Sequence, residues 1–217
     1  MAKQTRIAIA VIGDLIDSKA IKDRFEFQER FARDLADISK WQVDSPYTLT
    51  LGDEFQALYT HEKGLFYDLF HIRECLYPVR CRFSIAIGEI TTAINRQQAI
   101  GMDGPAFHRA REGIEHLKKT GHQLSIAGLP WEGNAMLRPA INLLWESTAN
   151  WKPNRMKILR MEQDENWDST KQYGLNISER AINKNIREGL LKDWSRLIEA
   201  AEKEIDQLLN GNKGNPA

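Results

Sequence analysis

The sequence predicts an α+β protein in which a βαββαβ unit is followed by a helical region. Over the first 129 residues, short apolar runs with strand character alternate with segments whose apolar residues recur at helical spacing. From Pro130 onward tryptophan becomes frequent, and every periodic segment has helical spacing. These observations divide the chain into an α/β domain, residues 1–129, and an all-α region, residues 130–217.

The first domain is expected to begin with a central strand. Arg6–Gly13 is almost continuously apolar, as is typical of a strand covered on both faces. The segments expected next are a helix from Ser18 or Asp23 to about Lys40, hairpin strands Tyr47–Leu51 and Glu54–Tyr59, a helix at about Glu62–Tyr77, a strand at Val79–Ile90, a helix from Gly104 to Lys119, and a strand at Gln123–Ala127. This order is the split, ferredoxin-like arrangement, in which the first and third strands are central neighbours.

The second region is expected to be entirely helical. Its expected segments are helices at Gly133–Thr148 and Asn154–Met161, a helix-turn-helix at about residues 168–190, and a long amphipathic helix at Lys192–Leu209. The last helix is suited either to pack on the others or to mediate dimerisation. A homodimer is therefore one expected assembly.

The composition excludes several classes of protein. The 217 residues carry 30 basic and 30 acidic side chains, which argues against a wholly basic nucleic-acid-binding surface but allows a local basic patch. Cys75 and Cys81 lack metal-site spacing and are expected to be reduced thiols, with a disulfide as the alternative. There is no signal-peptide pattern and no apolar run of membrane-spanning length. We expect a cytoplasmic protein with no membrane partner.

Two aspartates are candidate ligands of a divalent cation. Asp14 follows the first strand, at the strand end where α/β sheets place their ligands. Asp53 lies at the tip of the expected hairpin, in the turn Gly52-Asp53. If the hairpin lies beside the first strand, the two carboxylates converge and repel each other unless a cation or proton lies between them. Such oxygen ligands suit Mg²⁺ or Mn²⁺. The alternative for Asp53 is a solvated turn residue.

A second candidate site is the start of the helix that begins near Gly104. Free backbone N–H groups at this helix start, together with Arg109 and Arg111, suit the binding of phosphate. His108 is a further candidate hydrogen-bond donor there. The alternative is that both arginines are solvated on an amphipathic helix.

A third candidate site is the second helix of the expected helix-turn-helix. Ser178 is a suitable N-cap for this helix, and Ile182, Ile186 and Leu190 form its apolar face. The opposite face carries side chains suited to base edges and phosphates in DNA: Arg180, Asn183, Lys184 and Arg187. The alternative is an ordinary helical bundle that packs against the first domain.

Four segments resemble the SatD family of bacterial proteins, and the resemblance spans nearly the whole chain. They are Ile12–Ser18 (IGDLIDS), Leu51–Gln56 (LGDEFQ), Arg82–Ile90 (RFSIAIGEI) and Met102–Arg111 (MDGPAFHRAR). The family is named after an acid-tolerance operon. The resemblance therefore implies a family without implying a defined biochemical activity.

Residues from about Arg6 to Ala127 also resemble the palm-like domain of class III nucleotidyl cyclases and of diguanylate cyclases. This resemblance implies that Asp14 and Asp53 hold the metal and that Leu15 adds a backbone carbonyl to it. The sequence departs from the pattern at Leu51, where diguanylate cyclases have glycine, and at His108, where cyclases commonly have asparagine. The resemblance therefore implies a metal and a nucleoside triphosphate more strongly than it implies cyclisation.

Three hypotheses of function follow from these features. The leading one is a DNA-binding regulator in which a nucleotide- and metal-binding sensor domain controls the helix-turn-helix. The second is an enzyme, a cyclase or nucleotidyltransferase, in which the helical region serves oligomerisation. The third is a non-catalytic interaction scaffold that keeps the palm fold.

Overall fold

A five-stranded sheet organises the part of the chain that the computed structural model describes, residues 6–38, 43–50, 52–128, 136–162 and 174–211. The strands are β1 (Arg6–Leu15), β2 (Ser45–Leu49), β3 (Glu54–Tyr59), β4 (Cys81–Ile90) and β5 (Leu124–Ala127). The helices are η1 (Ser18–Ala20), α1 (Arg24–Ile38), α2 (Leu65–Leu76), α3 (Pro105–Thr120), α4 (Leu137–Ser147), α5 (Pro153–Met161), α6 (Glu179–Glu188) and α7 (Leu191–Gly211). The predicted α+β class is confirmed.

β1 lies at the centre of the sheet, as its apolar sequence predicts. The strand order is β2-β3-β1-β4-β5, with β1 antiparallel to both β3 and β4, and β4 parallel to β5. The first and third strands are therefore neighbours, as the split βαββαβ order requires. In this register Asp14 lies directly opposite Glu54 on one side and Arg82 on the other.

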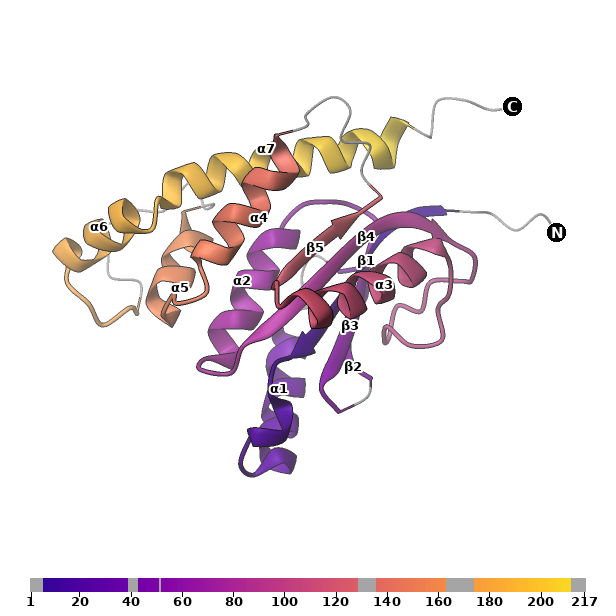
Figure 1. Ribbon diagram of the computed structural model, residues 1–217, viewed down its shortest axis with the longest axis horizontal. Helices are drawn as coiled ribbons and strands as arrows, with labels where there is room; N and C mark the ends of the chain where they lie inside the picture. The colour runs from indigo at the N-terminus through magenta and orange to yellow at the C-terminus, as the bar shows by residue number, and fades with distance from the viewer. Residues whose placement is uncertain (1–5, 39–42, 51, 129–135, 163–173, 212–217) are drawn as a thin grey trace.

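The two faces of the sheet are covered differently (Figure 1). Helix α3 packs on one face, where Ala8, Ala10 and Ile12 of β1 face Ala106, Ala110 and Ile114 of the helix. The alternate residues of β1, Ile9 and Val11, belong to the larger core on the other face, which includes the apolar sides of α1 and α2. Side chains alternate along a strand, so both faces of β1 are buried and the whole strand is apolar.

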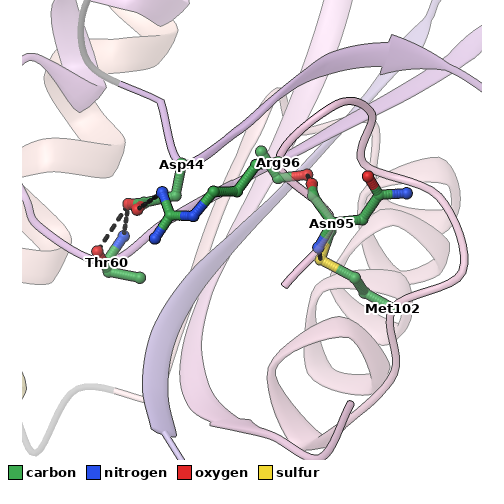
Figure 2. Close-up of polar contacts among 6 residues, drawn as sticks. Asp44, Thr60, Asn95, Arg96 and Met102 are labelled. Carbon is green, nitrogen blue, oxygen red and sulfur yellow. Dashed lines mark hydrogen bonds and ion pairs between the residues drawn. The ribbon is translucent and has the colours of Figure 1, made fainter. Parts of the chain in front are cut away.

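The connection between β4 and α3 is fixed to the rim of the sheet by polar contacts (Figure 2). Asp44 accepts hydrogen bonds from the backbone N–H and the hydroxyl of Thr60, both at 2.7 Å, and pairs with Arg96 at 3.2 Å. The backbone N–H of Asn95 donates to the sulfur of Met102 at 3.4 Å. These contacts hold the connection beside β2 and β3, next to the area that α3 covers.

The helices after β5 pack on α2 through a cluster of aromatic rings. Phe70 of α2 has ring centroids of Trp145, Trp151 and Trp194 at 5.0, 5.8 and 5.4 Å. Aromatic contacts of this kind add to the free energy that the buried area itself supplies. The helical segments therefore share one core with the sheet. The predicted domain boundary at residue 129 lies outside the described residues.

Helices α6 and α7 differ in one respect from the prediction. Leu190, expected on the apolar face of α6, lies between the two helices with a φ of 51° and is 53% exposed. The chain turns there, because α6 ends at Glu188. Residues 168–173, which were predicted to form the first helix of the helix-turn-helix, lie outside the described residues.

None of the described helices combines the length and the apolar character needed to cross a membrane. Cys75 and Cys81 are free thiols. Burial raises their pKa to about 11 and about 12, so neither is an activated nucleophile at neutral pH.

Candidate functional site

The β2–β3 hairpin brings Asp53 to the end of β1. The backbone N–H of Leu15 donates to the backbone carbonyl of Asp53 at 2.9 Å, and the Ser18 hydroxyl donates to the Asp53 carboxylate at 2.6 Å. Gly52 has a φ of 69°, a conformation that glycine adopts without strain. The hairpin tip is therefore anchored to β1 and to the turn that follows it.

Close packing also holds β3 against β1. The ring of Phe55, on β3, lies over Gly13, where any β-carbon would overlap it. Phe55 and Gly13 are register partners, so glycine at this position lets the aromatic ring cross β1. The residue next to Gly13 is Asp14, and the packing therefore helps to set where its carboxylate lies.

Asp14 is a buried carboxylate with two basic neighbours. Its side chain is only 8% exposed and lies 3.4 Å from Arg82 Nε and 3.4 Å from Lys118 Nζ. Arg82 comes from β4, and Lys118 comes from the last turn of α3. Burial raises the pKa of Asp14; Lys118 and Arg82 lower it, and the nearby Asp53 raises it. The Leu15–Asp53 backbone hydrogen bond places the hairpin tip next to the residue that follows Asp14.

The donor set at this end of the sheet suits a hard divalent cation. Asp14 lies at the end of β1, and the hairpin tip that carries Asp53 is bonded to the same strand end. Both ion pairs of Asp14 are longer than a normal N–H···O hydrogen bond, and the buried Arg82 Nε has no hydrogen-bond partner. No group of three or more His, Cys, Asp or Glu side chains with metal-binding geometry occurs among the described residues, so a bound Mg²⁺ would need oxygen ligands from substrate and water.

The predicted phosphate-binding residues lie elsewhere. The backbone at Gly104 packs against Glu89 and Ile90, and Ile90 pairs with Arg6 at the opposite end of β1 from Asp14, about 26 Å away along the strand. Arg109 donates to the backbone oxygen of Ile87 at 3.1 Å. The structure therefore does not bring the start of α3 to the aspartates.

A carboxylate of the chain itself, that of Asp103, already lies at the start of α3. His108 Nε2 lies 2.7 Å from the Asp103 carboxylate, and the backbone N–H of Gly104 and His108 both lower the pKa of Asp103. Arg111 is exposed, two turns before Lys118 and about 10 Å from it along the helix axis. A phosphate at this helix start would have to compete with Asp103.

The sequence prediction missed Arg82 and Lys118. Both follow from topology: α3 runs back from the end of β4 toward its start, and the start of β4 lies beside the end of β1. A helix of 16 residues is about 24 Å long, so its last turn reaches the Asp14 end of the sheet. The register of β1 and β4, in which Arg82 lies opposite Asp14, would have predicted that these two side chains are neighbours.

The residues predicted to contact DNA form an exposed face of α6, but this face has mixed charge. It surrounds a shallow hollow lined by Glu179, Arg180, Asn183, Lys184, Arg187 and Glu188. Lys184 pairs with Glu188 at 3.9 Å, and Arg155 pairs with the same glutamate at 3.6 Å. Part of the positive charge on α6 is therefore neutralised by its own acidic residues.

Solved structures similar to this chain include nucleotidyl cyclases. A bacterial light-regulated adenylyl cyclase has a TM-score of 0.40 and 12% identity over 58% of this chain and 44% of its own. The guanylyl cyclase Cya2 has a TM-score of 0.41 and 12% identity over 54% of this chain and 73% of its own. The present chain thus spans less than half the length of the adenylyl cyclase. The search of curated proteins gave no match.

These findings correct the leading hypothesis of a DNA-binding regulator. The predicted DNA-reading face of α6 carries two glutamates, and one of them, Glu188, pairs with both Lys184 and Arg155. The hypothesis is wrong, and Arg180, Asn183, Lys184 and Arg187 are no longer assigned to DNA.

The family comparison covers both parts of the chain. The model described as the SatD family matches residues 8–203, from β1 through most of α7. The sheet and the helices after it therefore belong to one family unit, as the resemblance of the four sequence segments predicted. The chain belongs to the SatD family.

Proposed function

We propose that this chain has a palm-like, nucleotidyl-cyclase-type fold and binds a nucleoside triphosphate together with Mg²⁺ or Mn²⁺ at the Asp14 end of its sheet. In this proposal Asp14 and Asp53 hold the cation, and the backbone at Leu15 lies between them. Nucleotidyl transfer or cyclisation is the reaction class that such a site serves.

One observation supports the proposal: the hairpin tip that carries Asp53 lies at the end of β1, where Asp14 has two basic neighbours. The Leu15–Asp53 backbone hydrogen bond places the hairpin tip at the end of β1, and Lys118 and Arg82 reach the Asp14 carboxylate from α3 and β4. Two carboxylates side by side favour a divalent cation, and two basic groups beside them favour the phosphates that accompany it.

In this proposal the acidic side chains hold the cation, and the basic side chains interact with the phosphates. When bound, a divalent cation neutralises negative charge on the phosphates and lowers the pKa of a coordinated hydroxyl. Lys118 is 38% exposed and also pairs with Glu115 at 3.2 Å, so binding of a phosphate oxygen would compete with both carboxylates for its ammonium. Arg82 is 15% exposed and stays beside Asp14. Ser18 orients the Asp53 carboxylate through its hydroxyl.

The proposal differs from the sequence prediction in where phosphates bind. Gly104, His108, Arg109 and Arg111 remain predicted phosphate ligands only for a nucleotide that reaches the far end of the sheet. The basic groups beside Asp14 are Lys118 and Arg82. We therefore assign the phosphate-binding role to Lys118, with Arg82 beside Asp14 as a second positive charge.

A thermal shift assay with each nucleoside triphosphate, with and without Mg²⁺ or Mn²⁺, tests the proposal. A ligand that binds only the folded state raises the midpoint of unfolding. We expect a metal-dependent rise in wild type that is lost in Asp14→Asn/Asp53→Asn. Asp17→Asn is the matched control, because Asp17 lies nearby but is 79% exposed.

A shift with nucleotide that persists in the double variant would contradict the site. The absence of any shift in wild type would contradict the function. If the shift is found, product analysis by chromatography separates a cyclase, which releases pyrophosphate and a cyclic monophosphate, from a protein that binds without turnover.

A further inference from the structure

A second site lies on the other face of the sheet, where the α2–β4 turn meets the α4–α5 connection. A cavity of about 220 Å³ opens there, with Arg73 at its base and Arg80 and Asn150 at its rim. Tyr77, Trp151 and Met156 supply apolar walls. Cys81 lies in the same wall and is the register partner of Leu15, so the cavity is at the same end of the sheet as Asp14.

The guanidinium of Arg73 is buried and is held in one position. Arg73 is 9% exposed; its terminal nitrogens donate to the hydroxyl of Thr148 and, at 2.7 Å, to the Thr148 backbone oxygen. Its planar group lies over the rings of Trp145 and Phe70, at 5.2 and 5.9 Å from their centroids. The group is therefore pre-organised, which lowers the entropy cost of using it to bind a ligand.

Arg73 has no acidic partner within the described part of the chain. Thr148 takes two of the five N–H groups of a guanidinium, and no carboxylate among the described residues forms an ion pair with the rest. The charge of Glu146 raises the pKa of Arg73, but its carboxylate accepts from the backbone N–H of Gln123 at 2.9 Å and lies 3.3 Å from His122. A buried charge without a counter-ion is costly, and burial accordingly lowers the pKa of Arg73.

A ligand would supply the missing negative charge. Arg80 is 59% exposed, and its one ion pair with a described residue is a 3.9 Å contact with the exposed Asp17, so its guanidinium can reach an anion at the rim. The mouth of the cavity carries the polar side chain of Asn150, while Trp151 and Met156 contribute an apolar wall. This combination suits a small molecule with an anionic oxygen group at one end and a compact apolar body.

We propose that the Arg73 cavity binds a small carboxylate- or phosphate-bearing molecule, whose anionic group pairs with Arg73 and Arg80. The site is separate from the nucleotide site proposed above, because β1 and β4 lie between them. Its walls come from α2, β4 and the α4–α5 connection. A ligand there would bridge the sheet and the helices that follow it.

Isothermal titration calorimetry on the full chain tests this proposal. The probes are benzoate, phenyl phosphate and inorganic phosphate, in metal-free buffer with a chelator, and benzyl alcohol serves as the uncharged probe. We expect saturable binding of at least one anion and none of benzyl alcohol. Binding of benzoate alone assigns a carboxylate, whereas binding of the phosphates alone assigns a phosphate.

Three variants locate the binding. Arg73→Gln should weaken it by roughly tenfold or more, because a hydrogen-bonded charge is lost. Arg80→Gln, at the exposed rim, should weaken it by about threefold or less. Ala149→Phe should block it by filling the cavity while leaving Arg73 in place, which keeps the test valid if Arg73→Gln folds poorly.

Two results would overturn the proposal: no saturable binding of any anion to wild type, or unchanged affinity in both Arg73→Gln and Ala149→Phe. Asp14→Asn distinguishes the two sites. It should leave anion binding in metal-free buffer unchanged while it removes the metal-dependent nucleotide shift. Loss of anion binding in Asp14→Asn would assign the anion to the Asp14 site instead.

Discussion

Asp14 and Arg73 are buried charges at the same end of the sheet, on opposite faces, and their surroundings differ. Asp14 has two basic side chains at 3.4 Å and a second carboxylate nearby. Arg73 has hydroxyl, carbonyl and aromatic neighbours, and no carboxylate among the described residues pairs with it. Basic side chains of the chain therefore balance the charge of Asp14, whereas no described carboxylate balances the charge of Arg73.

The difference teaches what each face is suited to bind. Around Asp14 both signs of charge are present, as a site for a cation and an anion together requires. Around Arg73 no carboxylate of the described residues forms an ion pair with the guanidinium, so the missing partner is an anion. Since an unpaired buried charge lowers stability, the comparison can be tested through the free energy of unfolding.

The largest effect is expected from truncating the unbalanced charge. Arg73→Ala removes both hydrogen bonds to Thr148 and the stacking on Trp145, and it leaves a void. We expect a loss of about 3 kcal/mol in the free energy of unfolding, measured by urea titration.

Arg73→Met is the matched control. Methionine keeps most of the packing volume and removes the cost of burying a charge, so its stability should lie within about 1 kcal/mol of wild type. A loss as large as that of the alanine variant would mean that the charge itself stabilises the fold, and that Arg73 needs no ligand.

Asp68 of α2 is a third ionisable side chain shielded from solvent, and its contribution to the free energy of unfolding should depend on pH. Burial raises its pKa from 3.8 to about 7, and Arg160 and the hydrogen bond from Tyr59 offset only part of this rise. Between these values the folded chain holds a proton that the unfolded chain releases. The free energy of unfolding should therefore fall as pH rises from about 4 to about 7, by roughly 2 kcal/mol.

Urea titrations at pH 5 and pH 8 check this dependence in wild type and in Asp68→Asn. The asparagine variant should show a smaller difference between the two pH values. Glu202, whose pKa is raised to about 7 mainly by burial, titrates in the same range, and Glu202→Gln identifies its share. Equal pH dependence in wild type and Asp68→Asn would show that Asp68 ionises normally.

A smaller effect is expected from a pair that is partly open to solvent. Arg160 of α5 donates to Glu74 of α2 at 2.7 and 3.2 Å, with both side chains about one-fifth exposed. Arg160→Ala should cost about 1 kcal/mol. Its control is Arg196→Ala, because the Arg196–Asp193 pair is long, at 3.6 Å, and well exposed. That variant should change stability by at most a few tenths of a kcal/mol; equal losses in the two variants would contradict this ranking.

Patterns local in sequence predicted the elements well. The apolar run of β1, the hairpin at Gly52-Asp53 and the Ser178 N-cap all form where propensity and turn chemistry place them, and Ser178 accepts from the Ala181 backbone N–H. Strand neighbours also followed from the order of elements. This was enough to predict that the hairpin tip with Asp53 lies at the end of β1, where the Leu15–Asp53 backbone hydrogen bond holds it.

Contacts between side chains that are distant in sequence could not be predicted from local patterns. Glycine, proline and two arginines at the start of α3 form a recognisable motif, whereas Lys118 is one lysine among several on an amphipathic helix. Arg73 likewise resembles any basic residue on a helix, and its burial depends on helices that follow much later in the chain. Tertiary packing, not local pattern, decides which basic side chains are functional candidates.

The two ends of α3 give the most specific test, because the two variants should change ligand affinity without changing the fold. Lys118→Ala removes the ammonium beside Asp14 and should reduce the metal-dependent affinity for nucleoside triphosphate by roughly tenfold, without loss of the fold. His108→Ala, at the other end of the helix, breaks only an exposed contact with Asp103 and should leave that affinity unchanged. Nucleotide titrations followed by thermal shift compare the two variants. If His108→Ala weakens binding and Lys118→Ala does not, the phosphates bind at the start of α3, and the Asp14 carboxylate is held by Lys118 and Arg82 for stability alone.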